Sequence, residues 1–326
     1  MTKTKILIVG IGGVGGYLGG LLARAYQGND DIEIYFLSRG QNLSKIKSDG
    51  IRVLDDGNEF TAHPDLVSDN INDFGLVDYT LICTKTYSLP DIAQQIAPCI
   101  GDSTVLIPLQ NGVNSRDILL KFFPSNLITH GCVYLVSRLE SPGLIQKKGQ
   151  VGSLFFGLSN MQDDRLQALK EILVNASVKA ELSSDIDKVI WEKFIFLSSI
   201  ATATTYFDSN IHEILSSKER LQLLKSLIKE VTELAYSKAI KIEENQTERV
   251  LSILNSLPGD ATTSMHSDFR NHNEQTELES LTGFVVKEGI KENVSIKTFE
   301  MMYNEIKKRL TKPVSNSALQ DTTTQS

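Results

Sequence analysis

"KILIVGIGGVGGYLGGLL", residues 5–22, decides the fold of the first half of the chain. An apolar, β-branched run, residues 5–9, leads into a glycine-rich turn, after which apolar residues recur at helical spacing. In this pattern Gly10 permits a tight turn, Gly12 lets a pyrophosphate approach the backbone, and Gly15 lets the helix pack on the strand. The helix N-terminus then presents N–H groups to phosphates. The stretch predicts a dinucleotide-binding unit, with these cofactor-binding residues: Gly10, Gly12, Gly13, Val14 and Gly15.

The end of the next predicted strand favours NADP over NAD. "DIEIYFL", residues 31–37, is followed by Ser38-Arg39-Gly40, where an NAD-specific site usually carries an acid for the ribose 2′-hydroxyl. Arg39 can instead pair with a 2′-phosphate through a charge-assisted contact. We therefore expect NADP(H) as the cofactor, with a solvated loop arginine as the alternative.

Two further predicted strands deliver polar residues to one rim of the sheet. "VDYTLICTK", residues 77–85, ends at Lys85, and "STVLIPLQNG", residues 103–112, ends at Asn111-Gly112. In a doubly wound sheet, ligands bind at the carboxyl ends of the strands. The alternatives are a solvated lysine and a plain turn.

The pattern of elements divides the 326 residues into two domains and a tail. Strands and helices alternate in the first part, residues 1–184, as expected of an α/β Rossmann-type doubly wound domain. Residues 127–158 suggest antiparallel additions to its sheet, and a helix is expected over 163–175. Helical spacing alone continues over residues 185–311, which predicts an all-α domain, and residues 312–326 resemble a disordered tail.

Composition limits the partners and the location. The formal net charge of −7 disfavours nucleic acid and anionic membranes. The chain opening lacks a signal-peptide cleavage site, so we expect a cytoplasmic protein. Three cysteines without a CxxC pair argue against disulfides and zinc, and five histidines, expected as loop residues, lack ligand spacing, so no metal is predicted.

A lysine stands inside an apolar segment of the second half. "VIWEKFIFLSSIATATTYF", residues 189–207, is predicted to be helical, with Lys193, Leu197, Ala201 and Thr204 on one side. A buried lysine requires a carboxylate or an anionic substrate to offset its desolvation. The alternative is a lysine that reaches solvent at the helix edge.

A second polar cluster could supply that partner. "TTSMHSDFRNHNEQTELESLTGFVV", residues 262–286, carries Ser264, Asp268 and Glu277 in a loop that leads into a helix near Thr276. A carboxylate there could pair with Lys193, and Ser264 could hydrogen-bond a substrate carboxylate.

Together these motifs resemble the 2-dehydropantoate 2-reductase (ketopantoate reductase) family over roughly residues 4 to 310. The resemblance implies NADPH-dependent reduction of ketopantoate to pantoate in the pathway to pantothenate and coenzyme A. It further implies that Lys193 is the general acid and that Glu277 orients it and the substrate hydroxyl. Ser264 would hold the substrate carboxylate, while Lys85 and Asn111 would line the nicotinamide and substrate region. Asp268 would be structural.

The resemblance departs from the family at two substrate positions. Asparagines common four and eight residues after the catalytic lysine are replaced by Leu197 and Ala201. A pocket without those amides recognises a hydroxyl poorly, unless Thr204, or Ser198 and Thr202, compensate. A reductase of another 2-keto acid, or of an imine as in opine-type dehydrogenases, is therefore the second hypothesis. A non-catalytic NADP-binding regulator is the third, and a homodimer is left open.

Overall fold

The computed structural model describes residues 3–311, so the predicted tail lies outside the described residues. The described chain forms two compact units. The first runs to Ile195 and includes Ala239–Glu244, and the second comprises Phe196–Lys238 and the described residues from Asn245 onward.

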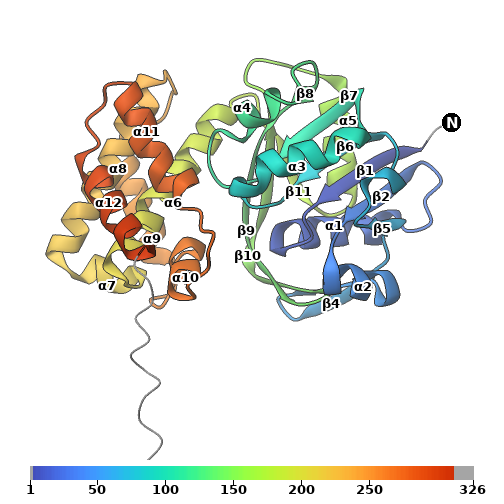
Figure 1. Ribbon diagram of the computed structural model, residues 1–326, viewed down its shortest axis with the longest axis horizontal. Helices are drawn as coiled ribbons and strands as arrows, with labels where there is room; N and C mark the ends of the chain where they lie inside the picture. Colours follow the sequence, from blue (N-terminus) through green and yellow to red (C-terminus); the bar gives the residue numbers. More distant parts are fainter. Residues whose placement is uncertain (1–2, 312–326) are drawn as a thin grey trace, which may run out of the picture. The chain divides into compact units, whose positions relative to one another are not determined.

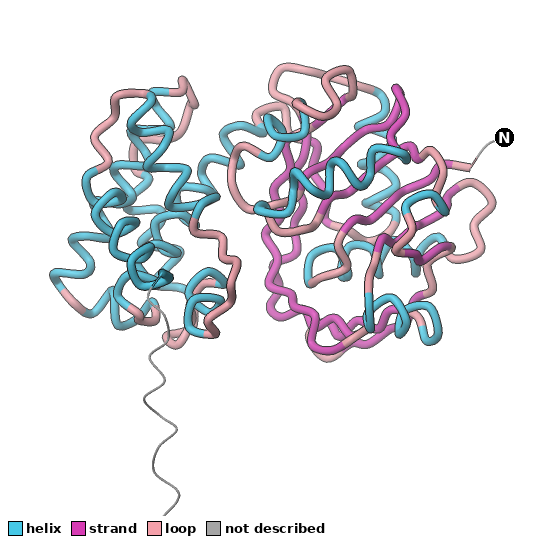
Figure 2. Tube along the Cα trace, viewed as in Figure 1, coloured by secondary structure: helices cyan, strands magenta, loops and turns pink. Residues whose placement is uncertain are grey.

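The first unit contains the predicted doubly wound sheet, which is parallel throughout (Figures 1 and 2). Its strand order is β5-β2-β1-β6-β7-β8, which in order of appearance is the 3-2-1-4-5-6 order of dinucleotide-binding domains. The strands are β1 (Thr4–Val9), β2 (Ile32–Leu37), β5 (Leu66–Ser68), β6 (Val77–Ile82), β7 (Ile100–Pro108) and β8 (Leu127–Ile128). The helices of this unit before α6 are α1 (Gly13–Tyr26), α2 (Gly40–Asp49), α3 (Leu89–Ile96), α4 (Ser115–Leu120) and α5 (Asp164–Asn175), the last confirming the helix expected over 163–175.

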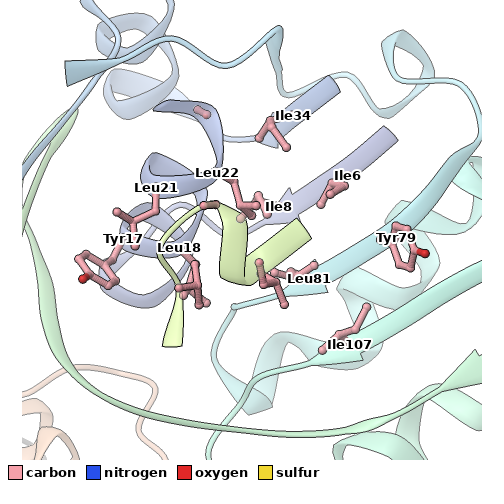
Figure 3. Packing of buried hydrophobic residues seen from close by; sticks show 14 of the residues in the cluster. Ile6, Ile8, Tyr17, Leu18, Leu21, Leu22, Ile34, Tyr79, Leu81 and Ile107 are labelled. Carbon is pink, nitrogen blue, oxygen red and sulfur yellow. The ribbon is translucent and has the colours of Figure 1, made fainter. Parts of the chain in front are cut away.

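Both faces of this sheet are buried, which explains the uninterrupted apolar runs of its strands. Along β1, Ile6 and Ile8 belong to one core cluster and Leu7 and Val9 to the other. Figure 3 shows the first cluster, in which leucines of α1 lie near Ile6 and Ile8 and near apolar side chains of β2, β6 and β7.

A second sheet covers the opposite side of α1, and here the expectation for residues 127–158 was wrong. The long strands β9 (His130–Ser141) and β10 (Leu144–Gly157) are antiparallel to each other. Yet β10 pairs with β3 (Ile51–Asp55) and β11 (Lys179–Leu182), and β3 pairs with β4 (Asn58–Ala62). Strand β10 thus belongs to a separate sheet together with the hairpin β3–β4, and it does not extend the parallel sheet.

Glycines of helix α1 let both sheets pack closely against it. A Cβ at Gly19 would lie 2.8 Å from the Phe36 ring of β2, and one at Gly16 only 2.4 Å from Ile145 Cδ1 of β10. The repeated glycines of α1 thus serve close packing on two sides, besides the phosphate loop at its start.

Helices are the only regular secondary structure among the described residues of the second unit, which confirms the predicted fold class. Helix α6 (Ile186–Phe207) belongs to both units. It is followed by α7 (Ile211–Ser216), α8 (Lys218–Ser237), α9 (Gln246–Ser256), α10 (Ser264–Arg270), the π-helical turn η4 (Glu279–Gly283), α11 (Phe284–Lys291) and α12 (Lys297–Thr311). Helix α8 packs against α7, α9, α11 and α12. No helix among residues 3–311 is long and apolar enough to span a membrane.

Candidate active site

The glycine loop leaves open space at one position and close contacts at the others. Gly10 has a φ of +90°, which favours glycine, and Gly12 is the residue that precedes α1, without a side-chain cap. A Cβ at Gly12 would meet no heavy atom within 4 Å, whereas one at Gly15 would lie 2.1 Å from Gly10 O. At Gly13 the close neighbour is Ser137 O of β9, at 2.2 Å from such a Cβ. Gly12 is thus the point where a phosphate can reach the backbone.

Side chains beside this loop connect it to the end of β2. Asn42 Nδ2 donates to Ile11 O at 3.0 Å and to Ser38 Oγ at 3.3 Å. Arg39, the residue that precedes α2, is exposed and donates to the Gln95 side chain of α3. The structure therefore places Arg39 at the same sheet edge as the glycine loop. The side chain of Val14 is half-buried and packs against the core cluster that includes α1.

The ends of β6 and β7 continue the same edge. Backbone hydrogen bonds join Cys83 N to Val9 O at 2.8 Å and Leu109 N to Ile82 O at 2.9 Å. Beyond these bonds Lys85 is exposed, and Thr86 Oγ1 donates to Asn111 O at 2.8 Å. The two predicted rim residues thus follow adjacent strands, as the sequence indicated.

Lys193 lies against Asn111 within the first unit. Its Nζ donates to Asn111 Oδ1 at 3.1 Å and to Val133 O at 2.6 Å, and it stands 5.6 Å from the centroid of the Tyr134 ring. A carbonyl, an amide oxygen and an aromatic face all favour an ammonium ion. The lysine is therefore directed to the end of β7.

Sequence reasoning missed the part that β9 plays here. Val133 contributes a backbone carbonyl, which no residue type signals, and Tyr134 stood in a run interpreted only as a short strand. Burial raises the pKa of the neighbouring Cys132 thiol, against the opposing effect of the Lys193 charge.

In the second unit, Ser264 and Glu277 form a hydrogen-bonded pair. Ser264 Oγ, on the first residue of α10, donates to Glu277 Oε2 at 3.2 Å. Glu277 is only 2% exposed. It precedes η4, so the helix expected near Thr276 begins as a π turn, a feature frequent at functional sites. Asp268 lies one turn after Ser264 on α10 and accepts from Asn273 Nδ2 at 2.8 Å.

Two of the three hydroxyls considered as substitutes for the family asparagines, those of Thr202 and Thr204, have partners elsewhere in the second unit. Thr202 Oγ1 lies 2.7 Å from Thr282 Oγ1, and Thr204 Oγ1 lies 2.9 Å from Thr263 Oγ1. Thr202 and Thr204 are fully buried. His266, expected as a polar loop residue, is also buried, within α10.

The polar atoms around the glycine loop suit a dinucleotide. Thr84 Oγ1, Gln110 Oε1 and Ser137 Oγ are buried near the loop and strand ends, without a hydrogen-bond partner among the described residues. Orphaned polar atoms beside an open glycine cradle are what a polar cofactor satisfies. Over residues 3–311, no cluster of three or more His, Cys, Asp or Glu side chains could hold a metal ion.

The fold and the site define a class, the pyridine-nucleotide-dependent oxidoreductases with a Rossmann-type domain and a helical second domain. Two family models give the particular assignment. "Ketopantoate reductase PanE/ApbA" matches residues 6–160, and "Ketopantoate reductase PanE/ApbA C terminal" matches residues 185–310. The chain belongs to the ketopantoate reductase family. Membership supports the reduction of a 2-keto acid.

Individual relatives agree along nearly the whole chain. The crystal structure of 2-dehydropantoate 2-reductase from Porphyromonas gingivalis W83 is 33% identical, covers 94% of this chain and 99% of its own, and has a TM-score of 0.83. The uncharacterized oxidoreductase YkpB of Bacillus subtilis (strain 168) is 27% identical over 300 residues, which are 92% of this chain and 96% of YkpB. A D-mandelate dehydrogenase, solved with NADH and anilino(oxo)acetate, shares the fold at 23% identity and a TM-score of 0.82, covering 94% and 98% of the two chains.

Proposed function

We propose that the protein uses NADPH to reduce a 2-keto acid to a 2-hydroxy acid, with 2-dehydropantoate as the first candidate substrate and pantoate as the product. The observation that carries this proposal is the position of Lys193. Its ammonium group is held by Val133 O and Asn111 Oδ1 at the strand-end rim that also bears the glycine loop.

The chemistry requires a proton donor at the carbonyl oxygen of the substrate. When bound, the nicotinamide supplies a hydride to C2 of the keto acid. Negative charge then develops on the carbonyl oxygen, and Lys193 stabilises it and donates the proton. Two acceptors fix the direction of Nζ before the substrate arrives, and such preorganisation is what makes a general acid effective.

Two residues of the second unit have the remaining proposed roles. Ser264 holds the carboxylate of the keto acid, and Glu277 orients both Lys193 and the substrate oxygen. The hydrogen bond between Ser264 and Glu277 supports their joint action.

NADPH is the proposed cofactor. The position of Arg39 directly before α2, after the second strand of the sheet, supports this choice, because Rossmann domains commonly read the ribose 2′ position there. Lys85 and Asn111 complete the nicotinamide end of the site. The NADH in the D-mandelate dehydrogenase structure makes NAD the alternative to be tested.

A second candidate is a 2-keto acid whose side chain is apolar. Leu197 and Ala201 follow Lys193 by four and eight residues on α6, so they lie along the same side of the helix. Such residues favour a hydrocarbon group over a hydroxyl, and the D-mandelate dehydrogenase illustrates that a protein of this fold handles an aromatic 2-hydroxy acid.

A panel of 2-keto acids distinguishes these candidates. NADPH oxidation is followed by absorbance with ketopantoate, with branched and aromatic 2-keto acids, and with keto acid plus amine for imine reduction. Highest kcat/KM with ketopantoate supports the first candidate, and preference for an apolar keto acid supports the second. If no member of the panel supports NADPH oxidation, the proposed function is contradicted. The remaining hypothesis is then a non-catalytic NADP-binding regulator.

A further inference from the structure

Four buried threonines join the elements that carry Ser264 and Glu277 to helix α6. We call Thr202, Thr204, Thr263 and Thr282 the threonine bracket. Thr202 and Thr204 lie on α6, Thr263 precedes α10, and Thr282 lies in η4. All four are buried, with exposed fractions of 8% or less. A buried hydroxyl without a partner is costly, so the two pairs constrain where these elements can sit.

The pair at α10 joins two hydroxyls that also bond the backbone. Thr204 Oγ1 donates to Ile200 O at 2.8 Å. It also lies 2.9 Å from Thr263 Oγ1, a contact in which either hydroxyl can be the donor. Thr263 Oγ1 in turn accepts from His266 N at 3.3 Å, as the N-cap of α10. The chain of bonds fixes the first turn of α10, where Ser264 is the next residue after Thr263.

A second contact holds the same helix farther along. His266 Nε2 lies 2.8 Å from Asp208 Oδ1, and Arg270 Nε donates to that oxygen at 2.6 Å. Asp208 directly follows α6 and has a φ of +49°. Helix α10 is thus tied to the end of α6 at two points, and it cannot rotate without breaking one of them.

The second pair, Thr202 and Thr282, holds the turn that follows Glu277. Gly283 N bonds Leu278 O at 2.9 Å, an i→i−5 hydrogen bond of the π turn. Leu281 N, next to Thr282, donates to Glu277 O at 3.0 Å, so Glu277 is joined to the same turn. The Thr202–Thr282 contact at 2.7 Å therefore sets the position of the turn that follows the carboxylate.

We propose that the threonine bracket is a set of positioning residues, which uses α6 as a common reference to hold Ser264 and Glu277 in the geometry needed for substrate binding. This inference rests on the proposed function. A helix contact maintained only for stability would change the melting temperature without a selective effect on the keto acid.

Substitutions on α6 test the bracket with a matched control. Thr204→Val and Thr202→Val keep the shape of the side chain but remove the hydroxyl. Thr205→Val is the control, because Thr205 is 1% exposed on the same helix and its Oγ1 has no hydrogen-bond partner among the described residues. Thr204→Ser and Thr202→Ser restore the hydroxyl.

The measurements are the kcat and KM for the preferred keto acid, the KM for NADPH and the melting temperature. We expect Thr204→Val to raise the keto-acid KM at least about fivefold and Thr202→Val to lower kcat at least about fivefold, since a mispositioned group of this kind loses about 1 kcal/mol of interaction. The NADPH KM should stay within about twofold, the serine variants should recover, and Thr205→Val should match wild type.

Two outcomes would overturn the inference, and they are distinguishable. If the valine variants keep wild-type kcat and KM, or change only in melting temperature, the bracket does not position the site although the proposed function stands. If wild-type protein turns over no keto acid, the proposed function fails first, and the inference about what the bracket positions falls with it.

Discussion

Substituting alanine for Gly12 separates cofactor binding from folding. Gly12 has φ −92° and ψ −155°, an extended conformation open to any residue, and a Cβ there meets no heavy atom within 4 Å. Alanine is a poorer N-cap than glycine, but it also reduces the entropy of the unfolded chain, so the free energy of unfolding should change by less than about 1 kcal/mol. The added methyl group would fill the space through which a pyrophosphate reaches the N–H groups of α1.

The expected loss of affinity follows from the contact that the methyl group prevents. A hydrogen bond from a backbone N–H to a charged phosphate contributes about 1.5 to 3 kcal/mol. Losing one raises the Kd for NADPH by roughly 10-fold to 150-fold. Gly15→Ala is the contrasting variant, because its Cβ would lie 2.1 Å from Gly10 O and must displace backbone. That overpacking costs about 1 to 3 kcal/mol and should lower the melting temperature by several degrees.

Thermal unfolding without cofactor and fluorescence titration with NADPH give the two quantities. The reasoning is refuted if Gly12→Ala binds NADPH as tightly as wild type, because the pyrophosphate then does not approach at Gly12. It is equally refuted if Gly12→Ala unfolds as readily as Gly15→Ala.

Three further perturbations address other parts of the account. Arg39→Ala should raise the Kd for NADPH about tenfold relative to that for NADH, and parallel titrations with both cofactors measure the ratio. Hydrogen bonding from His266, and then from Arg270, lowers the pKa of Asp208, so this carboxylate stabilises the fold above the unfolded-state pKa of an aspartate and loses that effect as pH falls through the folded-state value. Asp208→Asn should therefore have a lower melting temperature than wild type at pH 7, and this difference should shrink below about pH 4. An equal difference in melting temperature at both pH values would contradict this. Tyr134→Leu should reduce kcat about threefold to tenfold by removing the aromatic face near Lys193, whereas Tyr134→Phe should retain it, and steady-state kinetics compare the two.

The parallel sheet and the helical second unit were predictable because each depends on local periodicity. The run at residues 5–9 and the glycines after it have one common structural interpretation, and α6 shows helical spacing along its length. The second sheet was not predictable in the same way. Its strand β10 draws partners from β3, β9 and β11, and such pairings depend on contacts distant in the sequence.

The residues of the candidate site were likewise predictable only where the sequence marks them locally. Asn111 and Lys193 were selected from separate motifs, and in the structure Lys193 Nζ lies 3.1 Å from Asn111 Oδ1. The carbonyl of Val133 could not be selected, since every residue carries one. From the sequence, Ser264 and Glu277 were expected only to lie in the same polar loop. Their hydrogen bond was not predicted, because the π turn that follows Glu277 was not recognised from the sequence.

The most direct test of the central claim is the turnover number of Lys193→Ala. With the keto acid that wild-type protein reduces best, the account predicts a kcat at least ~10²-fold below wild type, since a positioned general acid contributes typically ~10² to 10⁴-fold. NADPH affinity should change little. A kcat equal to that of wild type would remove Lys193 from the mechanism and contradict the account.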